Sequence, residues 1–369
     1  ILMGIPEKIK AIQDEILRTQ NNKATEHHIG LLKAKIAKLK REQETEQVKK
    51  SAKKQDGFDV KRTGDATVVF IGLPSVGKST LLNRLTGSKS AIGAYQFTTL
   101  TVVPGVMNYR GARIQVLDLP GIIKGASTGK GLGKRILSVA RSADIVLLVL
   151  DVFQPYHEDV LINELGNIGI RLNQTPPDIV IEKSTTGGIA VAQQKKLKKM
   201  SEKLLKEILN IYGYTSARVV IKEDIESEQL IDFINGNKTY AKGITILNKI
   251  DLVDEKFLKD VSKKLKTDFI PTSADSNKNI NQLKERIYNE LKFIRIYLRP
   301  KGGETDFKEP LIVRKGNTVA DVCNKLHRNM KKDFRFGLVW GKSVKFGGQR
   351  VSLNHVLIDE DVLTVVKKR

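Results

Sequence analysis

The sequence is poor in cysteine and in long apolar stretches, and each shortage excludes a class of protein. Cys323 is the single cysteine among 369 residues, which excludes an intrachain disulfide and a zinc site built from several cysteines. Its helical spacing with Val319, Val322 and Leu326 predicts a small, buried side chain. No apolar run approaches the roughly 20 residues of a membrane-spanning helix, and the first thirty residues are charged throughout. We therefore expect no membrane span and a reducing, cytoplasmic setting.

Positive charge, by contrast, is abundant. The chain has 64 Lys and Arg against 41 Asp and Glu, a formal net charge of +23. An excess of this size favours a polyanionic partner, such as RNA, a ribosome or an acidic protein, over solubility alone. A well-solvated surface is the alternative that composition leaves open. Hydrophobic residues make up 40% of the chain, enough for the cores of two or three domains.

The stretch TVVFIGLPSVGKSTLLNR, residues 67–84, predicts a nucleotide site. A β-branched and aromatic run leads into G-x-x-x-x-G-K-S and then into a helix-forming sequence, which is the context of a phosphate-binding P-loop. Gly72 and Gly77 let backbone N–H groups face phosphate oxygens, and the helix N-terminus adds partial positive charge. Lys78 supplies a charge for the β- and γ-phosphates, and the Ser79 hydroxyl is placed to ligate Mg²⁺. The remaining predicted contacts come from Pro74, Ser75, Val76 and Thr80.

Two later segments are predicted to respond to the γ-phosphate. Thr98 and Thr99 end a polar segment where a loop hydroxyl can close on magnesium, and strand alternation does not separate the two. A strand at 113–117 then delivers D-L-P-G, in which Asp118 can hold magnesium through water and the Gly121 N–H can contact the γ-phosphate. A D-x-x-G is frequent by chance, but one strand beyond a P-loop it becomes a specific signal.

The identity of the nucleotide base is predicted from residues 244–251, which form a buried strand ending in N-K-I-D. The Asp251 carboxylate can accept hydrogen bonds from guanine N1–H and its exocyclic amino group, a pattern that adenine lacks. Asn248 and Lys249 are expected to brace the loop and the base, and the base edge is covered after the next strand by Ser273 and Ala274. This favours GTP and GDP, with Mg²⁺, over an ATPase.

The fold class predicted is α/β, a P-loop domain with a parallel sheet. Around it we expect an N-terminal helical hairpin, an α+β insert and a C-terminal β-grasp-like domain with strand order β-β-α-β-β. The expected boundaries are 3–57 for the hairpin and linker, 58–169 and 241–292 for the nucleotide-binding domain, 170–240 for the insert and 293–369 for the last domain.

Basic surfaces are predicted on all three additions to the nucleotide-binding domain. The hairpin carries basic residues on its expected outer face, and the insert carries a lysine-rich helix from about 195 to 211. The residues are Lys33, Lys35, Lys38, Lys40 and Arg41, and Lys195, Lys196, Lys198, Lys199, Lys203 and Lys206. An RNA contact and a solvated helix face both remain open for these surfaces. Residues 293–369 hold 17 Lys and Arg against 8 Asp and Glu without a catalytic constellation, which is typical of a docking module.

Three further stretches sharpen these motifs into a family resemblance: RTQNNKAT at 18–25, GIRLN at 169–173, and the end from 338–341 to 360–362. With them the chain resembles the developmentally regulated GTP-binding proteins (DRG), and it is more like the second of the two branches of that family. The resemblance implies a helix-turn-helix, a G domain interrupted by an insert resembling a ribosomal-protein domain, and a TGS domain. It also implies a cytoplasmic GTPase acting on translating ribosomes with a DRG family regulatory protein. We expect a monomer within a heteromeric complex.

Carried over by position, the resemblance assigns phosphate and magnesium to the P-loop residues and favours Thr99 over Thr98 as the metal ligand. Lys78, Thr99 and Gly121 are then the residues that serve catalysis. Ile122 stands where many GTPases carry the glutamine that orients the attacking water, and a hydrophobic residue there is typical of this wider group. Ser75 is a departure, because relatives that use potassium often carry asparagine at that position. K⁺ as a further cofactor is therefore a hypothesis.

Two functions of different classes fit this sequence. The first is a GTP hydrolase used as a conformational switch, slow by itself because it lacks the glutamine and an obvious arginine finger, and accelerated by a ribosome or partner. The second is a ribosome- or RNA-binding scaffold in which nucleotide only orders the structure. The basic hairpin and the C-terminal domain suit either function.

Overall fold

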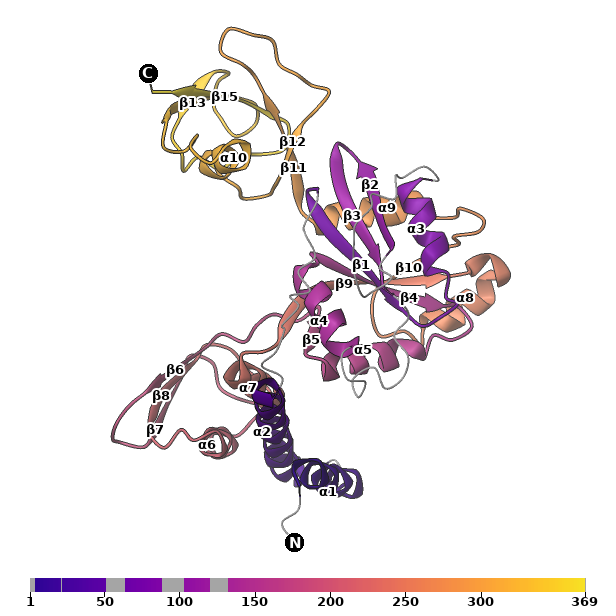
Figure 1. Cartoon of the computed structure of the whole chain (residues 1–369), viewed down its shortest axis with the longest axis vertical. Coiled ribbons are helices and arrows are strands. Elements are labelled where there is room, and N and C mark those ends of the chain that lie inside the picture. Colours follow the sequence, from indigo (N-terminus) through magenta and orange to yellow (C-terminus); the bar gives the residue numbers. More distant parts are fainter. Residues whose placement is uncertain (1–3, 21, 51–63, 88–102, 120–131, 369) are drawn as a thin grey trace. The chain divides into compact units, whose positions relative to one another are not determined.

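The computed structural model describes residues 4–20, 22–50, 64–87, 103–119 and 132–368 (Figure 1). These residues divide into two compact units. One unit combines the N-terminal helices with residues 173–240. The other contains the nucleotide-binding domain and the C-terminal domain, from residues 58–172 and 241–369. Each unit has its own hydrophobic core.

A seven-stranded sheet forms the centre of the larger unit, with strand order β10-β9-β4-β1-β3-β2 and with β5 pairing β9. Its parallel strands are β1 (Ala66–Gly72), β3 (Ala112–Asp118), β4 (Ile145–Asp151), β9 (Thr239–Asn248) and β10 (Phe269–Pro271). The edge strand β2 (Val103–Tyr109) is antiparallel to β3, and β5 is Ile170–Leu172. Strand β1 pairs in parallel with β3 and with β4, and β4 pairs in parallel with β9. The carboxyl ends of these four strands therefore share one edge of the sheet.

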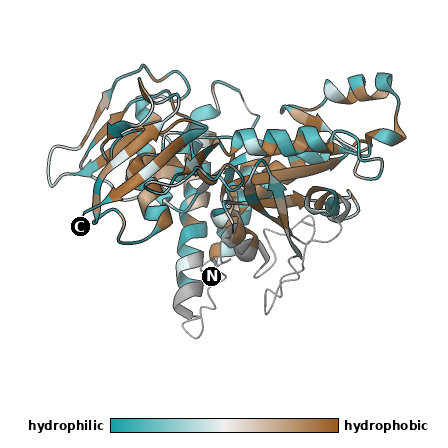
Figure 2. Cartoon of the chain, turned by 90° about the horizontal axis from the view of Figure 1, so that it is seen from above, coloured by the Kyte–Doolittle hydropathy of each residue, from teal (hydrophilic) through white to brown (hydrophobic). Residues whose placement is uncertain are grey.

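Both faces of this sheet are covered by helices, as a doubly wound α/β fold requires. Val68 and Phe70 of β1 pack with α3 (Lys78–Thr86) and α9 (Ile280–Glu290). Val69 and Ile71 face the opposite core, which takes residues from α4 (Leu132–Ser142), α5 (His157–Asn167) and α8 (Glu255–Ser262). Figure 2 shows the strands predominantly in brown, the apolar end of the hydropathy scale. The predicted fold class is confirmed.

The C-terminal domain is a five-stranded sheet of order β12-β11-β15-β13-β14 with one helix. The elements are β11 (Phe293–Leu298), β12 (Leu311–Arg314), α10 (Val319–Leu326), β13 (Phe334–Trp340), β14 (Gln349–Val351) and β15 (Asp361–Lys367). The predicted β-β-α-β-β order missed β14, a strand of three residues, too short to show an alternating pattern. Cys323 is buried in this core, as predicted.

A second sheet, of three strands in the order β6-β8-β7, lies in the smaller unit. Its strands are β6 (Ile179–Lys183), β7 (Ile189–Gln193) and β8 (Ala217–Ile221), and its helices are α6 (Glu202–Ile211) and α7 (Ser227–Asn235). The N-terminal hairpin consists of α1 (Ile5–Arg18) and α2 (Glu26–Lys50). Among the helices that the structure describes, none combines the length and the apolar character needed to cross a membrane.

The lysine-rich helix predicted from about 195 to 211 is wrong in its first part. Helix α6 begins at Glu202, because the Ser201 hydroxyl caps it by accepting a hydrogen bond from the Leu204 N–H at 3.2 Å. Upstream, the backbone N–H groups of Lys198 and Lys199 donate to the Asp224 carboxylate at 2.9 and 3.1 Å, and these two bonds lower the pKa of Asp224. The first four lysines therefore lie before the helix rather than on one helical face.

The hairpin is not an independent element, since α2 packs on the insert. Ala34 is fully buried in the core of the insert, and a Cβ built on Gly30 would lie 2.9 Å from Leu204 Cδ2. Two lysines predicted for the outer surface also face the insert: Lys33 Nζ lies 2.5 Å from Glu228 Oε1, and Lys38 Nζ donates to the Ile211 carbonyl at 2.8 Å. The outer basic surface of the hairpin is therefore smaller than predicted.

Replacing Ala34 by glutamate tests this packing. The larger, charged side chain has no room or partner in the insert core, so Ala34→Glu should destabilise the smaller unit by about 3 kcal/mol or more. Hydrogen exchange of α2 and α6, with urea unfolding of the whole chain, measures the effect. Ala11→Glu makes the same change at an exposed position of α1 and should leave both readouts unchanged. Equal behaviour of the two variants would contradict the packing.

Candidate functional site

The phosphate loop joins β1 to α3 at the carboxyl edge of the sheet. Gly77 (φ 91°) and Ser75 (φ 63°) both adopt the left-handed backbone region, which glycine enters freely and serine at a cost. Lys78 Nζ donates to the Gly72 and Leu73 carbonyls at 3.0 and 2.8 Å. Its burial lowers the pKa of the Lys78 ammonium, and the nearby Asp118 carboxylate opposes that shift. The lysine head is therefore held inside the loop that it would share with a phosphate.

Asp118 ends β3 beside this loop. The Ser79 hydroxyl donates to Asp118 Oδ2 at 2.8 Å, while the buried Oδ1 has no hydrogen-bond partner among the described residues. Burial raises the pKa of Asp118, and the bond from Ser79 and the charge of Lys78 offset part of that rise. An unpaired buried carboxylate oxygen beside a serine hydroxyl is costly by itself and suits a hard cation. These two residues therefore fit Mg²⁺.

The described residues do not form a protein cage for a metal ion. The described residues contain no group of three or more His, Cys, Asp and Glu side chains placed to hold a metal ion. A magnesium ion held at Ser79 and Asp118 must complete its shell with phosphate oxygens, waters or residues outside the described ranges, which is how magnesium is usually bound at phosphate sites. The predicted residues Thr98, Thr99, Gly121 and Ile122 lie outside those ranges, and their roles stay predictions.

Asn248 connects the phosphate loop to the predicted base loops. Its Nδ2 donates to the Val76 carbonyl at 2.9 Å, and its Oδ1 accepts from the Ala274 N–H at 3.1 Å and from the Thr272 hydroxyl at 3.4 Å. A Cβ on Gly77 would clash with this side-chain amide. Gly77 is therefore required twice, by its backbone conformation and by the approach of Asn248. The sequence predicted the bracing role, and the structure identifies the partners.

The rest of the predicted guanine motif surrounds this connection. Lys249 adopts a left-handed conformation (φ 69°) and its Nζ lies 2.7 Å from Asp151 Oδ2. Asp251 is exposed in a short 3₁₀ turn, Ile250–Leu252. Ser273 is fully buried, and its hydroxyl accepts a hydrogen bond from the Ser276 N–H at 3.1 Å. The structure thus brings together the P-loop residues 72–80, Asp118, the N-K-I-D motif and residues 273–274.

Sequence reasoning missed two residues of this site. Asp151 fixes the ammonium of Lys249, and its place at the end of a continuous apolar strand was an available signal. Arg84, on α3, donates from Nε to the Ala274 carbonyl at 2.8 Å and from Nη2 to the Asp275 carbonyl at 2.9 Å. The sequence contains no signal for Arg84, because its partners lie 190 and 191 residues away.

Truncating Asn248 tests the connection. Asn248→Ala leaves the Val76 carbonyl and the Ala274 N–H without their buried partner, at about 1–3 kcal/mol. We expect the affinity for a fluorescent GDP analogue, measured by titration, to fall roughly 10- to 100-fold. Asn289→Ala removes an exposed asparagine of α9 and should bind like the parent chain. An unchanged affinity of Asn248→Ala would show that the connection does not organise the site.

Models of known protein families match the chain from residue 67 to residue 367, apart from residues 184–185. A family model described as "50S ribosome-binding GTPase" matches residues 67–183, and a model for the C-terminal region of that domain matches residues 186–293. The TGS domain model matches residues 294–367. The YchF GTPase of Schizosaccharomyces pombe is a structural neighbour with a TM-score of 0.43 and 14% identity, over 83% of this chain and 99% of that chain.

Relatives that match over nearly their full length are named as GTP-binding proteins. The chain is 51% identical to an uncharacterized GTP-binding protein of Methanocaldococcus jannaschii, over 100% of this chain and 94% of the relative. It is 44% identical to developmentally-regulated GTP-binding protein 1 of Xenopus laevis, over 100% of both chains. The identity to the developmentally-regulated GTP-binding protein 2 homolog of Dictyostelium discoideum is also 44%, over 99% and 100% of the chains. The predicted likeness to the second branch stays a prediction, but the chain belongs to the developmentally regulated GTP-binding protein family, with a P-loop GTPase domain and a C-terminal TGS domain.

Proposed function

We propose that this protein binds GTP and GDP with Mg²⁺ and hydrolyses GTP to GDP and phosphate as a conformational switch. The observation that carries the proposal is the pair of Ser79 and Asp118 beside the phosphate loop, with the buried Asp118 Oδ1 unpartnered among the described residues. Such an oxygen is satisfied when a cation and its waters occupy the site. Membership of the family supports the same reading.

In this proposal the loop holds the phosphates. The backbone from Gly72 to Thr80, including Pro74, Ser75 and Val76, surrounds them, and Lys78 exchanges its two loop carbonyls for β- and γ-phosphate oxygens. Ser79, Thr99 and Asp118 would hold Mg²⁺, with Asp118 acting through water. When bound, the metal offsets the negative charge of the phosphates.

The base is held by the second set of residues. Asp251 accepts two hydrogen bonds from guanine, and the Lys249 stem, fixed by Asp151, lies against the base. Ser273 and Ala274 cover its edge, kept in place by Asn248 and by Arg84. Asp251 is exposed, so the described residues leave its carboxylate accessible to a ligand.

Hydrolysis proceeds by in-line attack of water on the γ-phosphate. The Gly121 N–H contacts the γ-phosphate, Thr99 closes on it and Lys78 balances its developing charge. Ile122 cannot orient the water by hydrogen bonding, so the rate without a partner is slow. K⁺ is a further candidate cofactor near Ser75, the position at which relatives that use potassium often carry asparagine.

The cellular role proposed is action on translating ribosomes or their rRNA, in the cytoplasm, as a monomer within a complex that includes a DRG family regulatory protein. The net charge of +23 and the match to a family described as ribosome-binding support it. The scaffold function remains the second candidate, because the basic C-terminal domain can dock without hydrolysis.

Guanine selection by Asp251 can be tested by replacing its carboxylate with an amide. In Asp251→Asn one acceptor becomes a donor, so guanine loses a charged hydrogen bond worth about 1.5–3 kcal/mol, and xanthine, with a carbonyl at that position, gains a partner. We expect GDP affinity to fall at least roughly tenfold and xanthosine diphosphate to compete in a displacement assay. Asp254→Asn changes an exposed helix-capping residue and should keep guanine preference. Displacement of GDP by ATP from the parent chain would overturn the assignment.

Measurements of GTP turnover distinguish the switch function from the scaffold function. GTP hydrolysis by the purified chain should be slow alone and should rise when ribosomes are added in potassium buffer. Lys78→Ala should abolish both rates, because no other described side chain replaces its charge in the loop. Equal rates in sodium and potassium would remove K⁺ from the proposal. No stimulation by ribosomes, with ribosome binding and cellular function intact in Lys78→Ala, would instead favour the scaffold.

A further inference from the structure

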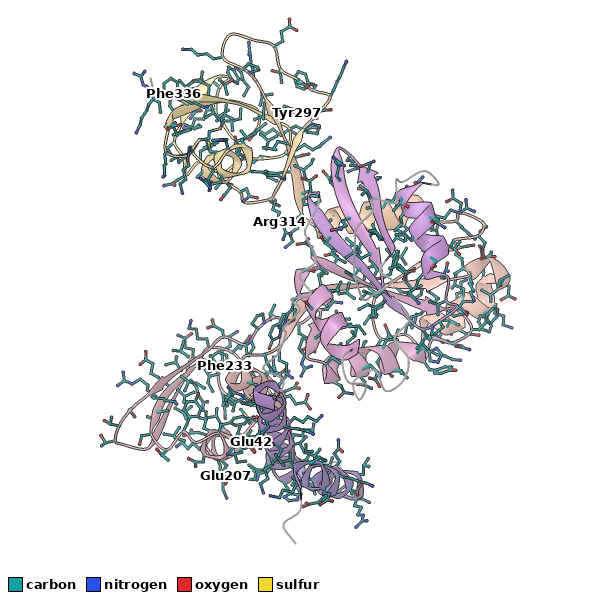
Figure 3. The ribbon with its side chains drawn as sticks, viewed as in Figure 1. Glu42, Glu207, Phe233, Tyr297, Arg314 and Phe336 are labelled. Carbon is teal, nitrogen blue, oxygen red and sulfur yellow. The ribbon has the colours of Figure 1, made fainter. Side chains whose placement is uncertain are left out.

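One face of the C-terminal sheet carries arginines and aromatic rings together. Strand β13 alternates: Gly337 and Val339 are buried on the side of α10, while Phe336, Leu338 and Trp340 are half-buried on the other side. Figure 3 shows Phe336 and Tyr297 within this domain. We name the surface the arginine–aromatic face and define it by Tyr297, Arg299, Arg335, Phe336, Trp340 and Arg350.

Strand register places Tyr297, Trp340 and Arg350 on the same face. Arg335 stands at a register shift between Phe334 and Phe336, and its guanidinium joins the face through its position near the Phe336 ring. Tyr297 of β11 pairs with Val362 of β15, which pairs in turn with Trp340 of β13, so the three form a row across the sheet. Leu338 pairs with Arg350 of β14, which puts Arg350 on the side of Phe336 and Trp340. The face therefore spans the sheet from β11 to β14.

Arginine guanidinium groups lie over the rings of this face, with Arg350 in the closest contact. The Arg350 guanidinium carbon lies 3.9 Å from the centroid of the Phe336 ring, with Arg335 at 6.0 Å from the same centroid. Arg299 lies 5.0 Å from the centroid of the Trp340 ring. Contact with a ring restricts the Arg350 guanidinium before any ligand arrives and leaves its N–H groups available.

Among the described residues, these arginines have no acidic partner. Within the described part of the chain, Arg335 and Arg350 have no ion pair, and Arg299 donates from Nε to a backbone carbonyl, that of Gly303. Arg295, in the same domain, differs: its Nη2 lies 2.7 Å from Asp359 and 2.8 Å from Glu360. The domain around the face has 17 basic and 8 acidic residues, so the field there attracts an anion.

We propose that the arginine–aromatic face binds single-stranded RNA. Guanidinium edges suit phosphates, and the rings together with the guanidinium planes suit unstacked bases, a combination typical of single-strand recognition on sheets. Paired bases inside a duplex cannot reach the rings, and an acidic peptide uses the charges but has no bases to stack. The inference deepens the proposed action on ribosomes and rests on it for the source of the RNA in the cell.

The test is fluorescence anisotropy of the full chain with a labelled, unstructured RNA of about 12 nucleotides. The double variant Arg335→Gln, Arg350→Gln should bind at least roughly tenfold more weakly, and the slope of log affinity against log salt should fall by about 1.4, or about 0.7 for each lost phosphate contact. The matched control, Lys315→Gln with Arg328→Gln, removes the same charge from exposed positions that flank α10 and should bind almost like the parent chain.

Stacking is tested apart from charge. Arg350→Lys keeps the charge but loses the planar group, and Phe336→Leu keeps an apolar side chain but loses the ring. Each should weaken binding severalfold while thermal unfolding and basal GTP turnover stay at parental values. Duplex RNA of the same sequence should bind more weakly than the single strand.

Several outcomes would overturn the inference. They are no binding of the single strand by the parent chain, equal loss in the control pair, or equal competition by an acidic peptide, which would make the face a protein-binding site. Ribosome-stimulated turnover is measured separately. Its failure alone would count against the proposed switch while leaving RNA binding by this face intact.

Discussion

The side chain of Asn248 is the contact on which the nucleotide site of this protein depends. Three sequence-distant segments meet at one amide: the phosphate loop through Val76, the end of β9 that carries Asn248, and the loop after β10 through Ala274. A buried amide with its donor and acceptor satisfied in different loops fixes their relative positions, because moving either loop leaves a polar group unpaired. Gly77 has no side chain where this amide sits. The contact thus links the phosphate-binding and base-binding halves of the site.

The sheet explains why this meeting point exists. Parallel pairing of β1 with β3 and β4, and of β4 with β9, brings Gly72, Asp118, Asp151 and Asn248 to one edge. Both faces of the sheet are packed against helices, so the edge is rigid while the loops beyond it carry the chemistry. The cost is visible in the polar groups at that edge: Asp118 is buried with one oxygen unpartnered among the described residues, and burial raises the pKa of Asp118.

The additions to the G domain use their positive charge in different ways. In the smaller unit, Lys33 and Lys38 connect α2 to the insert, and Lys199 Nζ lies 2.9 Å from Glu226 Oε1. In the C-terminal domain, by contrast, Arg350 lies on the Phe336 ring and Arg335 lies near it, and neither has an ion pair in the described part of the chain. A basic composition therefore does not identify a binding surface until internal pairing is known. Stacked, unpaired arginines are the stronger indication.

The sequence by itself determined the P-loop, the D-L-P-G and N-K-I-D motifs and the strands that deliver them, because each depends on residue types at short, fixed spacings. The insert and the C-terminal domain were also recognisable from changes in periodicity. Only the tertiary structure decided that Ala34 and Gly30 seat α2 on the insert, that Asp151 holds Lys249, and that Arg84 fixes the loop after β10. It also decided that α6 begins at Glu202, since the Ser201 hydroxyl caps the helix and the distant Asp224 carboxylate accepts from the N–H groups of Lys198 and Lys199. Contacts such as those of Asp151 and Arg84, between residues 98 or more positions apart, leave no periodic trace in a single sequence. A small residue such as Ala34 reveals nothing of what packs against it until the fold brings its partner there.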